Sequence, residues 1–255
     1  MDVGHVLAEL APVVRLGAGA IALYGAGSLA VGDYRPGVSD LDLVAVVSEP
    51  LSDGQQGLLA NAHRRLMAEH AVAAKLHCAY VPVGRVADLA AAHPTWAHGR
   101  FVSRPLAAFA RAELFAGGVV AFGPAPAQLL PPVSRSDVEA AARTELVTIW
   151  RPNTRRPWLW WEDIYVDLGL VTLARAETTL SQGRLLTKTE AIERLPRLGV
   201  PATLVAEIAC RRRGERVETS PAQRVRRAVL VRRLVATGID NVLAASDGPR
   251  SGQPR

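Results

Sequence analysis

The spacing of hydrophobic and polar residues changes about half way along the chain. In the first half, short apolar runs alternate with segments of helical period, which is typical of strands that alternate with helices. There we predict helices at 5–15, 54–70 and 105–115, strands at 20–24, 40–47, 76–83 and 119–122, and irregular chain at 31–39 and 85–104. In the second half the pattern is helical throughout, and we predict helices at 136–150, 161–181, 188–195, 201–213 and 221–237.

This change of pattern predicts two domains. The Gly and Pro residues between positions 123 and 132 are the strongest linker signal in the middle of the chain. We therefore expect an α/β domain with a mixed sheet and flanking helices over residues 1–130, and an all-α helical bundle over 131–245. The Gly-, Pro- and Ser-rich residues 246–255 are expected to form a disordered tail.

The composition argues against several classes of protein. The chain has 255 residues, of which 49% are hydrophobic and 21% charged, so it can bury a core and is not disordered as a whole. Its two cysteines, Cys78 and Cys210, lie far apart and have no metal-type spacing, which favours a reducing compartment. We find neither a signal-peptide pattern nor an apolar run long enough to span a bilayer. We expect a cytoplasmic monomer with no membrane partner.

The positive charge allows an anionic partner. The formal net charge is +6, and only Lys75 and Lys188 are lysines. Nine of the arginines of the second half form one arginine-rich region, which comprises Arg211, Arg212, Arg213, Arg216, Arg224, Arg226, Arg227, Arg232 and Arg233. Such a region forms either a nucleic-acid interface or a solvated surface that also pairs with acids of the first domain. Because no zinc finger, RNP motif or interleaved aromatic residue accompanies it, we favour the surface and expect no nucleic-acid partner.

A glycine-serine turn followed by two acids carries the most specific chemistry. Gly27 and Ser28 follow the first predicted strand, and Asp40 and Asp42 open the second. Side chains at i and i+2 of a strand share a face, so the two carboxylates can share divalent cations. Mg²⁺ prefers carboxylates together with substrate phosphates, and a glycine turn lets the backbone approach a phosphate. The combination predicts a phosphoryl- or nucleotidyl-transfer site. Taken alone, each part is also compatible with a solvent-exposed loop.

These motifs resemble the nucleotidyltransferase superfamily, and within it the aminoglycoside (streptomycin/spectinomycin) adenylyltransferase family. The similarity extends over roughly residues 20–213. It includes the segment 120–130, the stretch 170–175 and the spacing from Arg175 to Lys188. The resemblance implies that Asp40 and Asp42 bind two Mg²⁺ ions. It also implies that Gly27, Ser28, Ser39, Arg175 and Lys188 bind ATP, the co-substrate.

Two positions depart from the family pattern. The glutamate that the family uses as general base corresponds to His77, which either accepts the proton in its place or is a half-buried strand residue without a catalytic task. The family's acceptor-binding acid has no counterpart in exact register. The acids nearby are Glu162, Asp163 and Asp167, and they suit a cationic acceptor. Trp96 is a candidate for the acceptor-binding surface, with His93 and His98 beside it in the sequence.

The resemblance implies transfer of AMP from ATP to a hydroxyl of a small acceptor, an aminoglycoside-type antibiotic, which would make the protein an antibiotic-resistance enzyme. The departures leave open a different hydroxyl acceptor. A second class of function also stays open, namely a catalytically weak domain that binds nucleotide or nucleic acid in a regulatory role.

Overall fold

The computed structural model describes residues 2–247 and divides the chain into two compact units, Met1–Ser134 and Arg135–Arg255. The division falls four residues after the boundary that we predicted at position 130.

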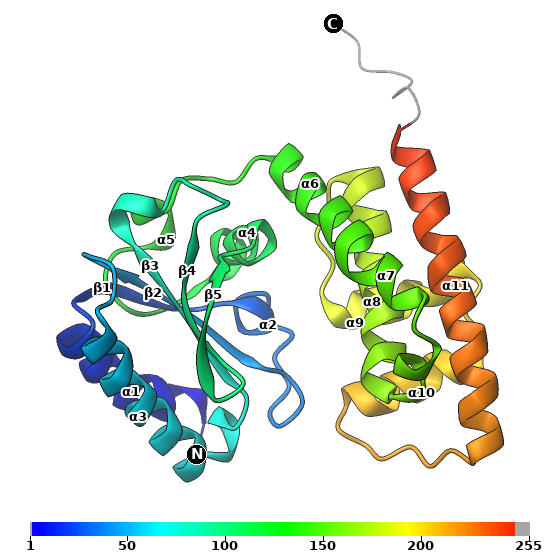
Figure 1. Cartoon of the computed structure of the whole chain (residues 1–255), viewed down its shortest axis with the longest axis horizontal. Coiled ribbons are helices and arrows are strands. Elements are labelled where there is room, and N and C mark those ends of the chain that lie inside the picture. The colour runs from blue at the N-terminus through cyan, green and yellow to red at the C-terminus, as the bar shows by residue number, and fades with distance from the viewer. Residues whose placement is uncertain (1, 248–255) are drawn as a thin grey trace, which may run out of the picture. The chain divides into compact units, whose positions relative to one another are not determined.

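The first unit is built on a mixed six-stranded sheet (Figure 1). Its elements are α1 (Val3–Gly17), β1 (Ala20–Gly25), α2 (Gly27–Ala30), β2 (Leu41–Val47), α3 (Asp53–Glu69), β3 (Leu76–Pro82), β4 (Ala92–Ala97), β5 (Arg100–Pro105), α4 (Ala108–Gly117), β6 (Val119–Phe122) and α5 (Pro126–Leu129), with 3₁₀ turns at Ala71–Ala73 and Val83–Arg85. The strand order is β5-β4-β3-β2-β1-β6. Only β2 and β3 are parallel among these neighbours.

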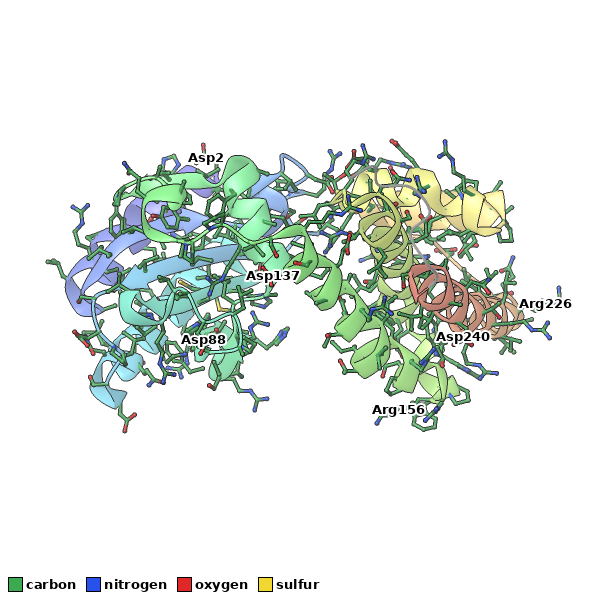
Figure 2. All side chains as sticks on the ribbon, turned by 90° about the horizontal axis from the view of Figure 1, so that it is seen from above. Asp2, Asp88, Asp137, Arg156, Arg226 and Asp240 are labelled. Carbon is green, nitrogen blue, oxygen red and sulfur yellow. The ribbon has the colours of Figure 1, made fainter. Side chains whose placement is uncertain are left out.

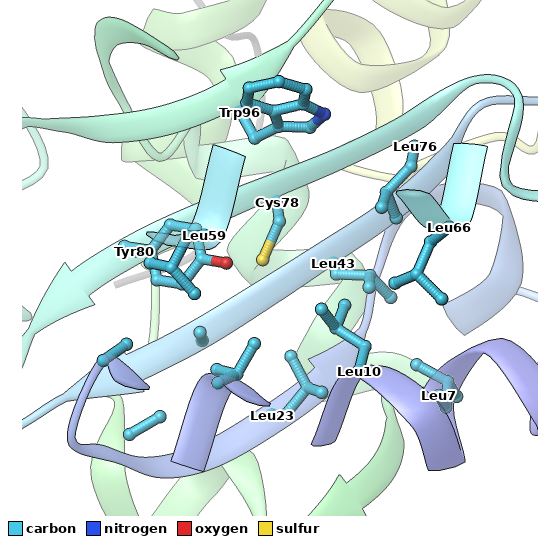
Figure 3. Close-up of a cluster of buried hydrophobic side chains, with 14 of the residues drawn as sticks. Leu7, Leu10, Leu23, Leu43, Leu59, Leu66, Leu76, Cys78, Tyr80 and Trp96 are labelled. Carbon is cyan, nitrogen blue, oxygen red and sulfur yellow. The ribbon is translucent and has the colours of Figure 1, made fainter. Parts of the chain in front are cut away.

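The two faces of this sheet carry separate cores because side chains alternate along each strand. On one face, Leu41, Leu43 and Leu76 pack with Cys78 under α1 and α3 (Figure 3). On the other face, Val44, Val46, Ala79 and Val81 pack with Leu106 and Leu114 near α4. Strand β2 is thus apolar on both faces, and Asp42 is its one acidic residue. Burying both faces fixes the register of β2, which in turn fixes where Asp42 points.

A hairpin occupies part of the segment that we predicted to be irregular at 85–104. Strands β4 and β5 pair from Ala92–Pro105 to Ala97–Arg100 across a turn at His98-Gly99, where both residues have positive φ angles, 50° and 77°. The alternation of apolar and polar residues that predicts strands is hard to detect here, because Pro94 lies inside β4 and β5 is mostly exposed. The hairpin is important for the candidate active site, because it forms part of the wall of the cavity there.

The regular elements that the structure describes in the second unit are all helices. Its elements are α6 (Arg135–Glu145), a π-helical turn (Leu146–Trp150), α7 (Arg151–Thr154), a 3₁₀ turn (Pro157–Trp161), α8 (Asp163–Gln182), α9 (Lys188–Arg194), a second 3₁₀ turn (Leu195–Leu198), α10 (Ala202–Arg212) and α11 (Pro221–Asp247). The long helices α8 and α11 pack closely at Gly238, where a Cβ would lie 2.4 Å from Leu173 Cδ2. The mixed sheet and the helical second unit confirm the predicted fold class.

Helix α11 extends farther than predicted. We expected it to end at 237, but it continues to Asp247. Ser246, which we assigned to the tail, is inside this helix, and its hydroxyl accepts a hydrogen bond from Arg143 at 2.8 Å. The rest of the predicted tail, residues 248–255, lies outside the described residues. Among the helices that the structure describes, none is long and apolar enough to cross a membrane.

Candidate active site

The glycine turn and Asp42 form one packed unit. Gly27 follows β1 with a positive φ of 56°, and the backbone N–H of Ala26 donates to the carbonyl of Asp42 at 2.8 Å. A Cβ at Gly27 would lie 2.5 Å from Asp42 Oδ2. Only glycine therefore fits here, both because of its backbone conformation and because of the close approach to the carboxylate.

Two alanine substitutions separate the effect of backbone strain at Gly27 from the effect of its contact with Asp42. Gly27→Ala is expected to displace the Asp42 carboxylate and to weaken binding of ATP with Mg²⁺ by at least about tenfold, since its new methyl group occupies the space of Oδ2. Gly37→Ala is the matched control. Its φ is also positive, 76°, but nothing lies within 4 Å of its added Cβ. Both variants should lose about 1–2 kcal/mol of stability, and equal binding of ATP by the two would contradict the role given to the Gly27 turn. Isothermal titration calorimetry and thermal unfolding make this comparison.

His77 lies beside Asp42 because β2 and β3 are parallel and pair Asp42 with His77. His77 Nδ1 is 3.4 Å from Asp42 Oδ1. The imidazole is nearly buried, with its side chain 11% exposed, whereas the Asp42 side chain is 40% exposed. The ring of His98, at the hairpin turn, meets the His77 ring edge-on at a centroid distance of 4.9 Å. The carboxylate is thus open to solvent while the imidazole beside it is held in place.

A cavity of about 260 Å³ opens over these residues. It is lined by Ala26, Gly27, Asp42, Leu43, Val44, His77, Ala79, Thr95, Arg104, Pro105, Leu106, Ala107 and Ala110. Thr95 and Arg104 come from the β4–β5 hairpin and are residues that our sequence reasoning did not select. The exposed Arg104 places a guanidinium on the wall of a cavity that also contains a carboxylate. Predicting the hairpin and its register would have been needed to find it.

Asp40, Ser28 and Ser39 are close in the sequence to residues that line the cavity, but they are not among its lining residues. Asp40 is half-buried one residue before β2, and its charge, after the larger effect of burial, raises the pKa of Tyr34. Ser28 is half-buried in α2. Ser39 is 4% exposed, and its hydroxyl accepts a hydrogen bond from the Arg35 backbone at 3.0 Å. In this structure Ser39 therefore shapes the loop before Asp40.

Trp96 does not line the acceptor surface that we predicted, and this assignment was wrong. Its partner across the ladder is Cys78, so its side chain lies on the sheet face opposite His77. It is fully buried there (Figure 3). Its ring stacks on His63 at a centroid distance of 5.1 Å, and its Nε1–H donates to Met67 Sδ. A tryptophan in a short alternating stretch cannot be assigned to one face until the strand register is known. His93 is also buried, with only 1% of its surface exposed.

In the second unit, two of the acids predicted to bind the acceptor form ion pairs instead. Asp167 accepts two hydrogen bonds from Arg211 at 2.7 and 2.8 Å, and Asp163 pairs with Arg227. Burial raises the pKa of Asp167, and the Arg211 pair opposes that shift. Glu162 stays exposed at the start of α8.

These pairs also account for part of the arginine-rich region. Arg211 and Arg227 are partly or fully buried against acids of α8 and α10, so they neutralise charge within the helical unit. Arg226 extends from the exposed side of α11 (Figure 2). In the part of the chain that the structure describes, Arg211 and Arg227 thus form ion pairs with acids of their own unit.

The two cations that we predicted to bind triphosphate are also in the second unit. Arg175 lies on α8, and its Nε donates to the Leu186 carbonyl at 2.8 Å, two residues before Lys188 begins α9. Thr187 caps α9 through a reciprocal pair of hydrogen bonds with Glu190. Arg175 and the start of α9 are thus tied together, and the cap fixes the direction of the chain at Lys188.

Comparison with solved structures identifies the architecture. The chain superimposes on spectinomycin adenyltransferase AAD(9) from Enterococcus faecialis, solved with ATP and spectinomycin, with a TM-score of 0.70. The alignment covers 92% of this chain and 99% of that one at 16% sequence identity. The chain shares the fold of that enzyme. At this identity the likeness shows the fold alone. No protein-family model and no curated protein sequence matches the chain.

The order of the strands in this fold explains why the glycine turn, Asp42 and His77 converge. Strand β1 delivers the turn and β2 delivers the carboxylate from the neighbouring position in the sheet. Strand β3 adds His77 from the other side. The three segments are separated along the sequence, and only the sheet order β3-β2-β1 brings them together.

Proposed function

We propose that the protein is a nucleotidyltransferase that transfers AMP from ATP to a hydroxyl group of a small, aminoglycoside-type acceptor. The observation that carries the proposal is the close packing of the Gly27 turn on the Asp42 carboxylate, beside His77 and on the wall of a cavity. The adenyltransferase fold supports it independently.

The residues present fit Mg²⁺. Asp42 offers a solvent-accessible carboxylate, and a Cβ at Gly27 would fill the space next to it. Hard oxygen ligands of this kind, completed by phosphate oxygens and water, are those that Mg²⁺ prefers. We assign Asp40 and Asp42 as the protein ligands of two Mg²⁺ ions. When bound, the ions would neutralise charge on the triphosphate and help to align the reacting groups.

The protein's own residues then bind and orient the substrates. Gly27 leaves room for the phosphates next to Asp42, with the Ser28 hydroxyl as a hydrogen-bond donor. Arg104 adds positive charge on the cavity wall. Arg175 and Lys188 are assigned to the triphosphate, and Ser39 supports the loop that precedes Asp40. Glu162 is the exposed acid assigned to a cationic acceptor.

His77 is assigned as the general base. Because Nδ1 faces Asp42 Oδ1, Nε2 is the nitrogen left to accept a proton. The acceptor hydroxyl loses its proton to His77, its oxygen bonds to the α-phosphorus of ATP, and the bond from that phosphorus to the pyrophosphate oxygen breaks. The products are the adenylylated acceptor and pyrophosphate.

An acceptor screen tests this function. The full chain is incubated with ATP, Mg²⁺ and single acceptors that include spectinomycin, streptomycin and other aminoglycosides. Pyrophosphate release and the mass of the acceptor are then measured. We expect both signals to appear together with at least one acceptor. Binding of ATP without pyrophosphate release for any acceptor would overturn the proposal and favour the regulatory alternative.

A further inference from the structure

Three potential metal ligands meet away from the candidate active site, where α1 packs against the end of α3. Glu9 lies on α1, Glu69 is the last residue of α3, and His70 follows it. One ligand atom from each residue lies within 4.8 Å of the other two. Figure 1 shows α1 and α3 side by side along one face of the sheet, and their contacts confirm this packing.

His70 distinguishes this cluster from an ordinary group of surface acids. Its side chain is only 5% exposed, yet neither ring nitrogen makes a hydrogen bond within the described part of the chain. Buried polar atoms are normally hydrogen-bonded, because leaving one unsatisfied costs about 1–3 kcal/mol. An imidazole that is buried and yet unsatisfied at the side of two carboxylates calls for a further partner.

The geometry around His70 suits a shared ion. His70 Nε2 lies 3.0 Å from Glu9 Oε1, a close approach that does not have the alignment of a hydrogen bond. Two atoms bound to one metal at about 2.0–2.2 Å are separated by roughly 3 Å. The backbone of His70 is held on both sides, because its N–H donates to Leu66 and its carbonyl accepts from Ala73, both at 2.9 Å. The ring is therefore presented from a fixed position.

The types of ligand in this cluster indicate which metal ion it can bind. One imidazole nitrogen with two carboxylates suits Zn²⁺ or a similar transition metal, whereas Mg²⁺ prefers oxygen ligands only. The carboxylates are accessible to an incoming ion, since the Glu9 and Glu69 side chains are 41% and 52% exposed. The other ionic contact of Glu69, to Arg65 at 3.9 Å, is exposed and easily displaced.

We propose that Glu9, Glu69 and His70 bind one Zn²⁺ ion, which ties α1 to the end of α3. The helices lie on the sheet face opposite Asp42 and His77, so this site is separate from the one proposed for nucleotide transfer. Its role is to stabilise the first unit, since it joins two helices that are distant in sequence.

Calorimetric titration with Zn²⁺ tests the proposal. The full chain is used with the substitution Asp42→Asn, which removes the carboxylate that lines the candidate active-site cavity. We expect one equivalent of Zn²⁺ to bind and the thermal midpoint to rise by a few degrees. Adding Glu9→Gln or Glu69→Gln should weaken binding by at least about tenfold, whereas Glu49→Gln, another exposed acid, should leave it unchanged.

Two further measurements keep the result unambiguous. Circular dichroism in EDTA should show that the Gln variants unfold at the same temperature as their parent, so any loss of binding is not a loss of fold. Co²⁺ should replace Zn²⁺ and give visible absorption bands that His70→Gln abolishes. The proposal is overturned if no Zn²⁺ binds, if bound Zn²⁺ is insensitive to all three substitutions, or if Mg²⁺ binds this cluster as tightly as Zn²⁺.

Discussion

Asp42→Asn is expected to lower the rate of pyrophosphate release by on the order of a thousandfold, which corresponds to about 4 kcal/mol of transition-state stabilisation. The substitution removes the negative charge that we propose to hold Mg²⁺, while keeping the shape that packs against Gly27. Binding of ATP in the presence of Mg²⁺ should weaken along with the rate. Steady-state pyrophosphate assays and calorimetry measure the two effects.

The matched control for this variant is Asp53→Asn, which removes an exposed carboxylate from the first turn of α3. Its rate should stay within about twofold of the wild-type rate, because surface changes of this kind seldom exceed about 0.5 kcal/mol. If Asp42→Asn keeps the wild-type rate and the wild-type affinity for ATP with Mg²⁺, Asp42 does not hold the metal and the proposed site is wrong.

His77→Ala is expected to lower kcat by about a hundredfold or more, since general bases contribute roughly 10²–10⁴. The KM for ATP should change little, because the proton transfer and not nucleotide binding is lost. A merely structural role for His77 would instead lower the amount of folded protein and leave the kcat of the folded fraction unchanged.

His77→Glu provides the second half of the test. It restores the residue type that the adenylyltransferase family resemblance implies at this position, and it places a second carboxylate beside Asp42. We expect a rate within about tenfold of the wild type, together with tighter binding of Mg²⁺. If His77→Ala is as active as the wild type, His77 is not the base, whatever the activity of His77→Glu.

The fold class and the core of the site follow from local patterns. The apolar run after Asp42 predicts a strand, and the glycine-serine turn after Tyr24 predicts the end of another. Asp42 and Gly27 could therefore be selected without knowing the fold. Asp42 and Gly27 touch because β1 and β2 are neighbours in the sheet. The family resemblance implied this arrangement, whereas the spacing alone did not.

The residues that sequence reasoning missed or misplaced depend on strand register and on long-range pairing. Trp96 and Arg104 belong to a hairpin whose Pro94 and exposed second strand obscure its alternation. Asp167 carries a charge suited to a cationic ligand, but Arg211, 44 residues later, neutralises it. Such partners become visible only when the helices are packed, because nothing local distinguishes a paired acid from a free one.

The glycine turn and the acid pair are proposed to form a metal-dependent nucleotide site. Calorimetric titration of the full chain with ATP, in the presence and absence of Mg²⁺, tests this most directly. We predict binding at one site that requires Mg²⁺ and is lost in Asp42→Asn. Absence of ATP binding, or binding of equal strength without Mg²⁺ and in Asp42→Asn, would contradict it.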